Sequence, residues 1–254
     1  MHELKGAANQ HGIWKCNECE WNTTCSDEGI WALHMLERAA TKILVDEIEL
    51  SADISLPDPS RGLVLFAHGS GSSRHSPRNR HVADLLNRRA IGTVLTDLLT
   101  AEEEARDAET AELRFNIPLL AHRVAAITDW IVREPRLKDF GLGYFGASTG
   151  AAAALVAAAE RPKLVRAVVS RGGRPDLAGP SLKHVVAPTL FVVGENDSVV
   201  LDLNDSAMAQ LPAETERRLE VVPGASHLFE ERGALDRVAE LAGDWFARHL
   251  AYFG

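Results

Sequence analysis

The chain has few cysteines and no long hydrophobic run. All three cysteines lie in the first tenth of its 254 residues, so disulfides cannot hold the rest of the chain together. No stretch approaches the roughly 18 to 20 apolar residues that a membrane-spanning helix needs. The first residues, MHELKGAANQHG, also lack the apolar run of a secretory signal. We therefore expect a soluble, cytoplasmic protein without a membrane partner.

The chain also has fewer basic residues than acidic ones. Lys and Arg number 27 against 36 Asp and Glu, which gives a formal net charge of −9. This balance provides no field that attracts nucleic acid, so we expect no nucleic-acid partner. The length is enough for one large α/β domain with a sizeable core. Nothing in the composition indicates an oligomeric state.

Two regions of the chain differ in pattern. Residues 1–40 contain all the cysteines and show no clear period until WALHMLERAA, which could form one or two helical turns. From Thr41 onward the pattern is regular. TKILVDEIELSADISLP alternates apolar and polar residues, as a half-buried hairpin does. We predict an accessory segment over 1–40 and one α/β domain over 41–254.

Apolar runs and helical patterns alternate through this second region. RGLVLFAHG is typical of a strand buried on both faces, and the runs that follow it are IGTVLTDLL, FGLGYFGAS, VRAVVSRGG, PTLFVVGEND and RLEVVPGAS. Strands separated by helices predict a mostly parallel sheet with helices on both faces. In such a sheet the active site lies at the carboxyl ends of the strands, so the loops there are the ones that matter.

One of these loops contains a candidate nucleophile. The segment GYFGASTG places Ser148 between Gly146 and Gly150, after a predicted strand and before an Ala-rich helix. A serine on such a sharp turn has a strained backbone and an exposed hydroxyl, and small residues on either side prevent collisions. The helix N-terminus behind it favours negative charge. We predict that Ser148 is a nucleophile.

A serine nucleophile needs a base, and the base needs an orienting acid. Asp197 follows the strand ending FVVG, and His227 follows the strand ending VVPG. Both would emerge at the same edge of the sheet as Ser148, in the chain order Ser, acid, His of the α/β-hydrolase fold. We predict His227 as the base and Asp197 as the acid. Glu195 is the main rival for the acid.

The loop after the first long buried strand, HGSG, is expected to complete an oxyanion hole. In this architecture that loop contributes one backbone N–H, and the residue after the nucleophile contributes another. These donors would be the N–H groups of Ser70 and Thr149. His68 is expected to be a structural hydrogen-bonding residue beneath the loop.

Five motifs together resemble the α/β-hydrolase superfamily, and more narrowly its dienelactone-hydrolase-like branch: AHGSGSSRHSPRN, GYFGASTGAAAAL, SRGGRPDLAG, VVGENDSVVLDLN and VVPGASHLFEE. The resemblance covers 41–254, which it identifies as an α/β-hydrolase domain. It implies little or no cap domain and hydrolysis of esters or lactones. The dienelactone hydrolases proper use a cysteine nucleophile, whereas this chain has Ser148, so the dienelactone substrate is not carried over. Relatives of this shape also occur fused to phosphoribosyltransferase domains, and nothing in this sequence resembles such a domain.

Arginines near the predicted strand ends bear on the substrate. Arg74 and Arg78 follow the oxyanion loop, and Arg171 and Arg174 follow a later strand. Arginines that face the site would favour an anionic group on the substrate. We select Arg74 and Arg171 as candidate substrate-binding residues, and we expect Arg78 to pair with surface acids or to stay solvated.

The cysteine cluster has two interpretations. Cys16, Cys19 and Cys25 could begin a zinc site, with His11 or His34 as the fourth ligand. Alternatively, they are incidental thiols of an accessory segment. One C-x-x-C pair and an odd cysteine fall short of the paired knuckles that indicate zinc, so we predict neither a metal nor a cofactor.

The sequence therefore predicts a serine hydrolase that cleaves small carboxylic esters or lactones through an acyl-enzyme, using Ser148, His227 and Asp197. Two alternatives remain. The same three residues could serve an acyltransferase or a perhydrolase. A binding or regulatory protein with an idle site is the other possibility, and the N-terminal cysteine segment keeps it open.

Overall fold

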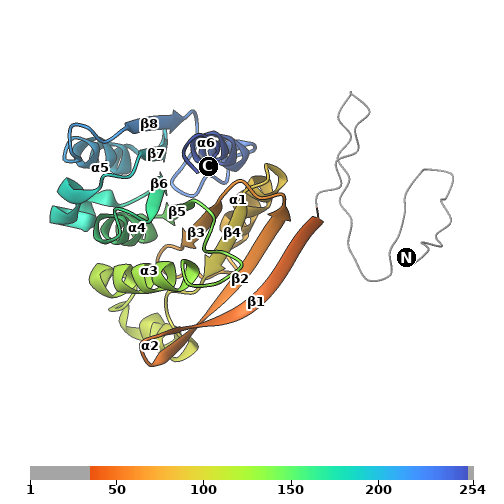
Figure 1. The fold of residues 1–254 in the computed structure, drawn as a ribbon. Coiled ribbons are helices and arrows are strands. Elements are labelled where there is room, and N and C mark those ends of the chain that lie inside the picture. Colours follow the sequence, from red (N-terminus) through yellow and green to blue (C-terminus); the bar gives the residue numbers. More distant parts are fainter. Residues whose placement is uncertain (1–34, 251–254) are drawn as a thin grey trace, which may run out of the picture.

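The computed structural model describes residues 35–250, which form one eight-stranded sheet with helices packed against it (Figure 1). The strand order is β1-β2-β4-β3-β5-β6-β7-β8. The strands are β1 (Met35–Val45), β2 (Ile48–Asp58), β3 (Leu63–Ala67), β4 (Gly92–Thr96), β5 (Leu142–Ala147), β6 (Val165–Arg171), β7 (Thr189–Gly194) and β8 (Arg217–Val222). The β1–β2 hairpin is antiparallel and joins β4 antiparallel, and every later pair is parallel.

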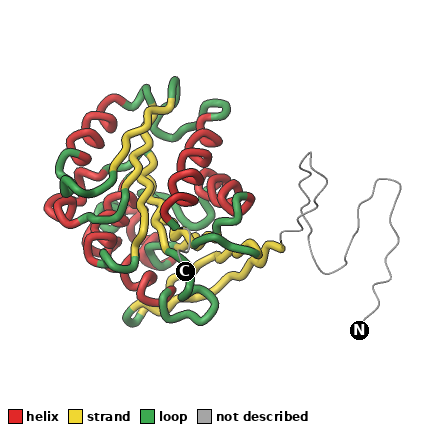
Figure 2. Tube along the Cα trace, turned by 45° about the horizontal axis from the view of Figure 1, so that its top comes forward, coloured by secondary structure: helices red, strands yellow, loops and turns green. Residues whose placement is uncertain are grey.

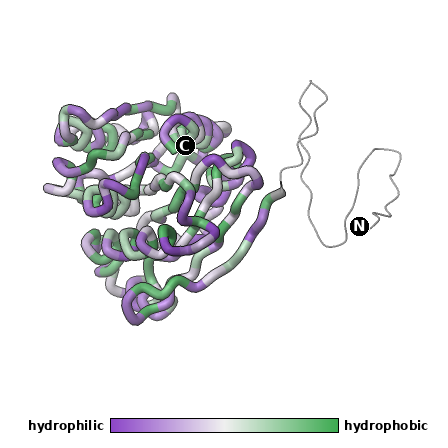
Figure 3. The backbone as a smooth tube through the Cα atoms, viewed as in Figure 1, coloured by the Kyte–Doolittle hydropathy of each residue, from purple (hydrophilic) through white to green (hydrophobic). Residues whose placement is uncertain are grey.

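Helices cover both faces of this sheet, which confirms the predicted α/β-hydrolase fold (Figure 2). The helices are α1 (Pro77–Arg88), α2 (Ala101–Thr110), α3 (Ile117–Ile131), α4 (Thr149–Glu160), α5 (Ser198–Met208) and α6 (Ala234–His249). Helices α1 and α6 pack together on one face, and α3 and α4 pack together on the other. Hydrophilic and hydrophobic residues are interspersed along the chain (Figure 3). In α1 and α6 the buried residues recur at helical spacing, as expected for helices that bury one face.

The central strands are apolar because they are buried on both faces. Every residue of β3, β4, β5 and β7 is buried. In β3, Leu63 and Leu65 contribute to the hydrophobic core on the side of α3 and α4, while Val64 and Phe66 contribute to the core on the side of α1 and α6. The two-residue period of a strand thus divides one apolar run between two cores.

Local sequence signals account for where two of the helices begin. The Ser76 side chain accepts a hydrogen bond from the N–H of Asn79, and Pro77 starts α1. At α2, Thr100 and Glu103 form a capping box, in which each side chain accepts a hydrogen bond from the backbone N–H of the other residue. Helix α2 is acidic, and all its residues except Asp107 are at least partly exposed.

The start of the sheet differs from the expected helical turn. Strand β1 begins at Met35, so the described part of WALHMLERAA is extended. Its residues pair with β2 along the whole strand, from Met35 opposite Asp58 to Val45 opposite Ile48. Backbone pairing with a neighbouring strand outweighs the helical propensity of LERAA because it satisfies the backbone groups of the segment and helps to cover the core.

The connection between β6 and β7 contains only the 3₁₀ segment η1 (Pro175–His184), so no cap domain is inserted there. Among residues 35–250, no helix combines the length and the apolar character needed to cross a membrane.

The two-sided burial of β3 leads to a stability prediction. Leu65 is fully buried in the core on the side of α3 and α4, and Leu65→Ala is expected to lower the free energy of unfolding by about 2 to 5 kcal/mol. Leu44, which is 66% exposed at the edge of the sheet, provides a matched control. Leu44→Ala should change stability by less than about 0.5 kcal/mol. Urea unfolding followed by circular dichroism measures both, and equal losses would contradict the described packing.

Candidate active site

Ser148 lies between the end of β5 and the start of α4, at the carboxyl edge of the sheet. Its φ of 50° and ψ of −120° are unusual for a residue with a side chain. Two backbone hydrogen bonds hold it there. The N–H of Ser148 donates to the carbonyl of Arg171, and the carbonyl of Ser148 accepts from the N–H of Arg174. The last residue of β6 and the loop after it therefore hold the strained turn that G-x-S-x-G predicts.

The two glycines of that motif allow the turn to close. A Cβ on Gly146 would lie 2.4 Å from the Cα of Ala151, and a Cβ on Gly150 would lie 2.2 Å from the carbonyl oxygen of Ala67. Real Cβ atoms do not make such short contacts. Strands β3 and β5 and helix α4 can therefore approach this closely only where these side chains are missing.

The structure brings His227 and Asp197 together. Asp197 follows β7 and His227 follows β8, and His227 Nδ1 lies 2.6 Å from Asp197 Oδ2. The His227 side chain is 38% exposed, whereas that of Asp197 is 15% exposed. This bond would fix the imidazole with Nδ1 protonated and leave Nε2 as the acceptor.

Ser148 shares this edge of the sheet with the pair. A Cβ on Gly172, the residue after β6, would lie 3.6 Å from His227 Nδ1, and β6 is the neighbour of β5. In the part of the chain that the structure describes, Ser148 Oγ forms no hydrogen bond with His227. Catalytic hydrogen bonds of this kind often tighten only when substrate binds.

The rival acid Glu195 has a different contact. Its carboxylate accepts a hydrogen bond of 2.7 Å from the backbone N–H of Gly224, and so supports the turn after β8. The side chain of Asp197, in contrast, contacts the imidazole directly. The geometry favours Asp197 over Glu195 as the partner of His227.

Ser70 and Thr149 also lie side by side. Their hydroxyl oxygens are 2.9 Å apart, which links the loop after β3 to the first turn of α4. Within residues 35–250, neither backbone N–H donates to a protein acceptor. Both donors predicted for the oxyanion hole are thus free and neighbouring.

The four arginines differ in their partners. The Arg74 guanidinium pairs with Asp97 and with Asp53, so its charge is balanced by two carboxylates. Arg174 pairs with Asp176 through two hydrogen bonds of 2.9 and 2.8 Å. Carboxylates of the protein therefore balance the charges of Arg74 and Arg174.

Arg171 is different because it is buried without an acid. It is 6% exposed, and its one side-chain hydrogen bond among the described residues is a long contact of 3.4 Å to Asn79 Oδ1. Its Nε has no partner there, and its guanidinium lies over the Phe229 ring, 5.8 Å from the centroid. Burial, with the nearby charge of Arg78, lowers the pKa of Arg171 to about 10, so it remains charged at neutral pH.

Arg78 has only a weak partner of its own. It reaches the exposed Glu230 at 3.3 Å, while its Nε is buried and unpartnered among the described residues.

Asn79 and Phe229 were not predicted from the sequence. Phe229 follows His227 by two positions, and that spacing is the one signal that could have indicated it.

Metal ligands are not gathered near this site. In the region from Met35 to Leu250, no cluster of three His, Cys, Asp or Glu side chains is arranged to share a metal ion. The candidate zinc ligands Cys16, Cys19 and Cys25 lie outside the described residues.

The eight-stranded sheet and the strained turn at Ser148 are those of the α/β-hydrolase class. Comparison with known families agrees, because the model of the dienelactone hydrolase family matches residues 82–254. The chain belongs to the dienelactone hydrolase family. A structure of a dienelactone hydrolase from Anabaena variabilis is 53% identical, with a TM-score of 0.82, and the match covers 85% of this chain and 99% of that one. Est1E from Butyrivibrio proteoclasticus shares the fold at 15% identity and a TM-score of 0.68, over 82% of this chain and 98% of that one.

A curated relative from Mycobacterium tuberculosis is 54% identical over 209 residues and carries the provisional name phosphoribosyl transferase. The match covers 82% of this chain and 46% of the relative. The chain therefore spans about half the length of that relative.

The lack of space for a side chain at Gly150 leads to a second prediction. Gly150→Ala places a methyl group against the carbonyl of Ala67 and is expected to lower stability by several kcal/mol or to prevent folding. Gly179→Ala is the control, because nothing lies within 4 Å of a Cβ at that position. The backbone of Gly179, with φ 51° and ψ −130°, should cost an alanine about 1 to 3 kcal/mol. Thermal melts of the two variants compare these effects, and a fully stable Gly150→Ala would refute the close approach.

Proposed function

We propose that the protein is a serine hydrolase that cleaves carboxylic esters or lactones through an acyl-enzyme. The observation that carries this proposal is the hydrogen bond between His227 and Asp197, at the same sheet edge as the strained Ser148 turn. An isolated serine hydroxyl is a poor nucleophile, and a base oriented by an acid is what activates it.

Each residue then has a defined role. Asp197 accepts a hydrogen bond from the Nδ1–H of His227, which leaves Nε2 free to take the proton from Ser148 Oγ. Oγ attacks the carbonyl carbon, and the oxyanion that forms accepts hydrogen bonds from the N–H groups of Ser70 and Thr149. His227 returns the proton to the leaving alcohol as the acyl-enzyme forms. Water, activated by the same imidazole, then releases the acid and restores Ser148.

The relatives support an ester or lactone substrate more than a phosphoribosyl group. The Anabaena structure is named a dienelactone hydrolase, and a lactone is an internal ester. The transferase name belongs to proteins of which this chain matches only 46%, and the matched part has the hydrolase fold. We therefore assign no phosphoribosyl transfer to this chain.

A fluorophosphonate probe and p-nitrophenyl acetate test this function. The probe should label Ser148, and Ser148→Ala should abolish both labelling and the acetate burst. Asp197→Asn is expected to lower kcat about 10⁴-fold because His227 loses its orienting carboxylate. Glu195→Gln, two residues away, is the matched control and should keep kcat close to the wild-type value. Wild-type protein that resists the probe would instead support a binding role with an idle site.

Arg171 supports a narrower proposal, that the substrate carries an anionic group. Burying a cation without a counter-charge is costly, and a bound carboxylate or phosphate would supply both the charge and the missing hydrogen bonds. Arg171 precedes Gly172, over which His227 lies, so such a group would sit close to the scissile bond. Arg78 adds a second positive charge. Arg74 does not support this role, because two carboxylates already balance its charge.

The charge requirement is testable with paired esters, a hemisuccinate and its neutral methyl counterpart. Arg171→Met keeps the volume and removes the charge, and it should lower kcat/KM for the anionic ester about 10- to 100-fold, the value of a charged hydrogen bond. The neutral ester should be hydrolysed as before. Arg174→Met controls for the loss of an arginine nearby. Equal losses on both esters would exclude an anion subsite at Arg171.

A further inference from the structure

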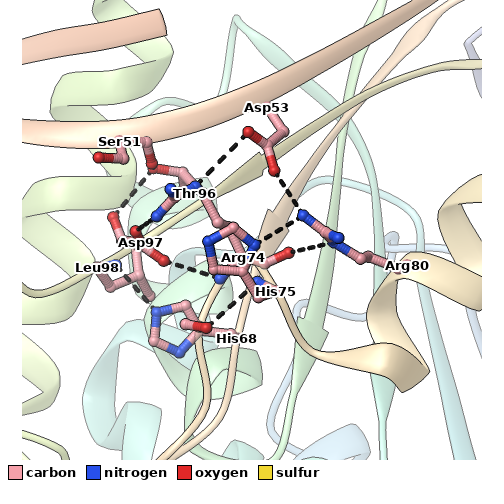
Figure 4. Close-up of polar contacts among 10 residues, drawn as sticks. Ser51, Asp53, His68, Arg74, His75, Arg80, Thr96, Asp97 and Leu98 are labelled. Carbon is pink, nitrogen blue, oxygen red and sulfur yellow. Dashed lines mark hydrogen bonds and ion pairs between the residues drawn. The ribbon is translucent and has the colours of Figure 1, made fainter. Parts of the chain in front are cut away.

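His68, at the end of β3, is buried and its two ring nitrogens have different partners (Figure 4). The backbone N–H of Leu98 donates to His68 Nε2 at 3.0 Å, so Nε2 is unprotonated. In a neutral imidazole Nδ1 then carries the proton, and it donates to the carbonyl oxygen of Gly69 at 3.0 Å. Burial lowers the pKa of His68, which keeps this neutral form at neutral pH.

The carbonyl that His68 holds belongs to the same peptide group as the Ser70 N–H. A peptide group is planar and trans, so its C=O and N–H point in opposite directions. Fixing the carbonyl toward the imidazole therefore fixes the direction of the Ser70 N–H away from it. The neighbourhood is tight, since a Cβ on Gly69 would lie 3.1 Å from the Cβ of Ser148.

The other end of this loop is held by Asp97, which follows β4 and directly precedes Leu98. Asp97 accepts a hydrogen bond of 2.8 Å from the backbone N–H of Arg74, and it also pairs with the Arg74 guanidinium. Asp53 of β2 contacts both Arg74 and Arg80, and Arg80 Nε donates to the Arg74 carbonyl (Figure 4). The consecutive residues Asp97 and Leu98 thus hold both ends of the loop that contains Ser70.

We propose that His68 is a positioning residue of the oxyanion hole. Its Nδ1–H tautomer orients the Gly69–Ser70 peptide so that the Ser70 N–H is directed at the carbonyl oxygen of an ester on Ser148. The Asp97–Arg74 pair fixes the other end of this loop, which gives Arg74 a positioning role as well. This proposal rests on the proposed ester hydrolysis. A donor that is oriented before the reaction costs no reorganisation when the oxyanion develops.

Two amide side chains separate the two bonds of His68. In His68→Asn the amide N–H can replace Nδ1–H at the Gly69 carbonyl, whereas in His68→Gln the amide oxygen can replace Nε2 at Leu98 but not the donor to Gly69. We expect His68→Asn to retain most of kcat. His68→Gln should lower kcat at least about tenfold with KM little changed, since removing an oxyanion donor outright costs about 10²- to 10³-fold.

The measurements are made on the full chain with p-nitrophenyl acetate, and kcat is expressed per site titrated by the fluorophosphonate probe. A trifluoromethyl ketone, which forms a tetrahedral adduct with the serine, should lose affinity for the Gln variant in proportion to kcat. A merely structural role would lower the titrated fraction and leave kcat per site unchanged. That result, or equal kcat per site in the Asn and Gln variants, would overturn the proposal.

Arg74→Met extends the test. A positioning role predicts a similar fall of kcat per titrated site for the neutral and the anionic ester, whereas a loss confined to the anionic ester would return Arg74 to substrate binding and overturn its positioning role. Ser148→Ala keeps the two proposals distinguishable. If Ser148→Ala retained activity, the proposed function would fail, whatever the His68 variants showed.

Discussion

The first turn of α4 lies so close to the end of β3 that Gly150 has no room for a side chain beside the carbonyl of Ala67. This contact places three features of the chain in one small volume: the Ser148 turn, the Thr149 N–H and the loop from His68 onward. The hydroxyl contact between Ser70 and Thr149 forms across it. Backbone strain at Ser148 is tolerated because the end of β6 holds its N–H and the loop after β6 holds its carbonyl.

Charge is distributed unevenly around this volume. Most arginines near the site are paired with carboxylates, as a chain with a net charge of −9 would lead one to expect. Arg171 departs from this pattern because its guanidinium is buried over the Phe229 ring, where no acid reaches it among the described residues. Burying this guanidinium without a counter-charge lowers the stability of the free protein.

The end of β4 connects the fold to the chemistry. Asp97 and Leu98 have no direct place in an ester hydrolysis, yet one binds Arg74 and the other binds His68. Because β4 lies next to β3 in the sheet, both anchors of the loop that contains Ser70 depend on strand order rather than on the loop itself. A cavity of about 290 Å³ opens beside this loop, with Glu104 and Arg114 among its lining residues, so the loop is also accessible from the α2 side.

Local pattern in the sequence determined much of the architecture. Apolar runs predicted the central strands, because a strand buried on both faces excludes polar side chains. The glycines around Ser148 predicted the turn, because the collision they avoid is between near neighbours along the chain. The same reasoning put Asp197 and His227 after adjacent strands.

Tertiary structure alone decided the rest. LERAA became part of β1 because β2 offered backbone partners, and Arg74 and Arg171 acquired opposite environments because their neighbours, Asp53, Asp97, Asn79 and Phe229, come from distant segments. The charge partner of an arginine depends on which strands and helices fold against it, and a one-dimensional pattern contains no record of that.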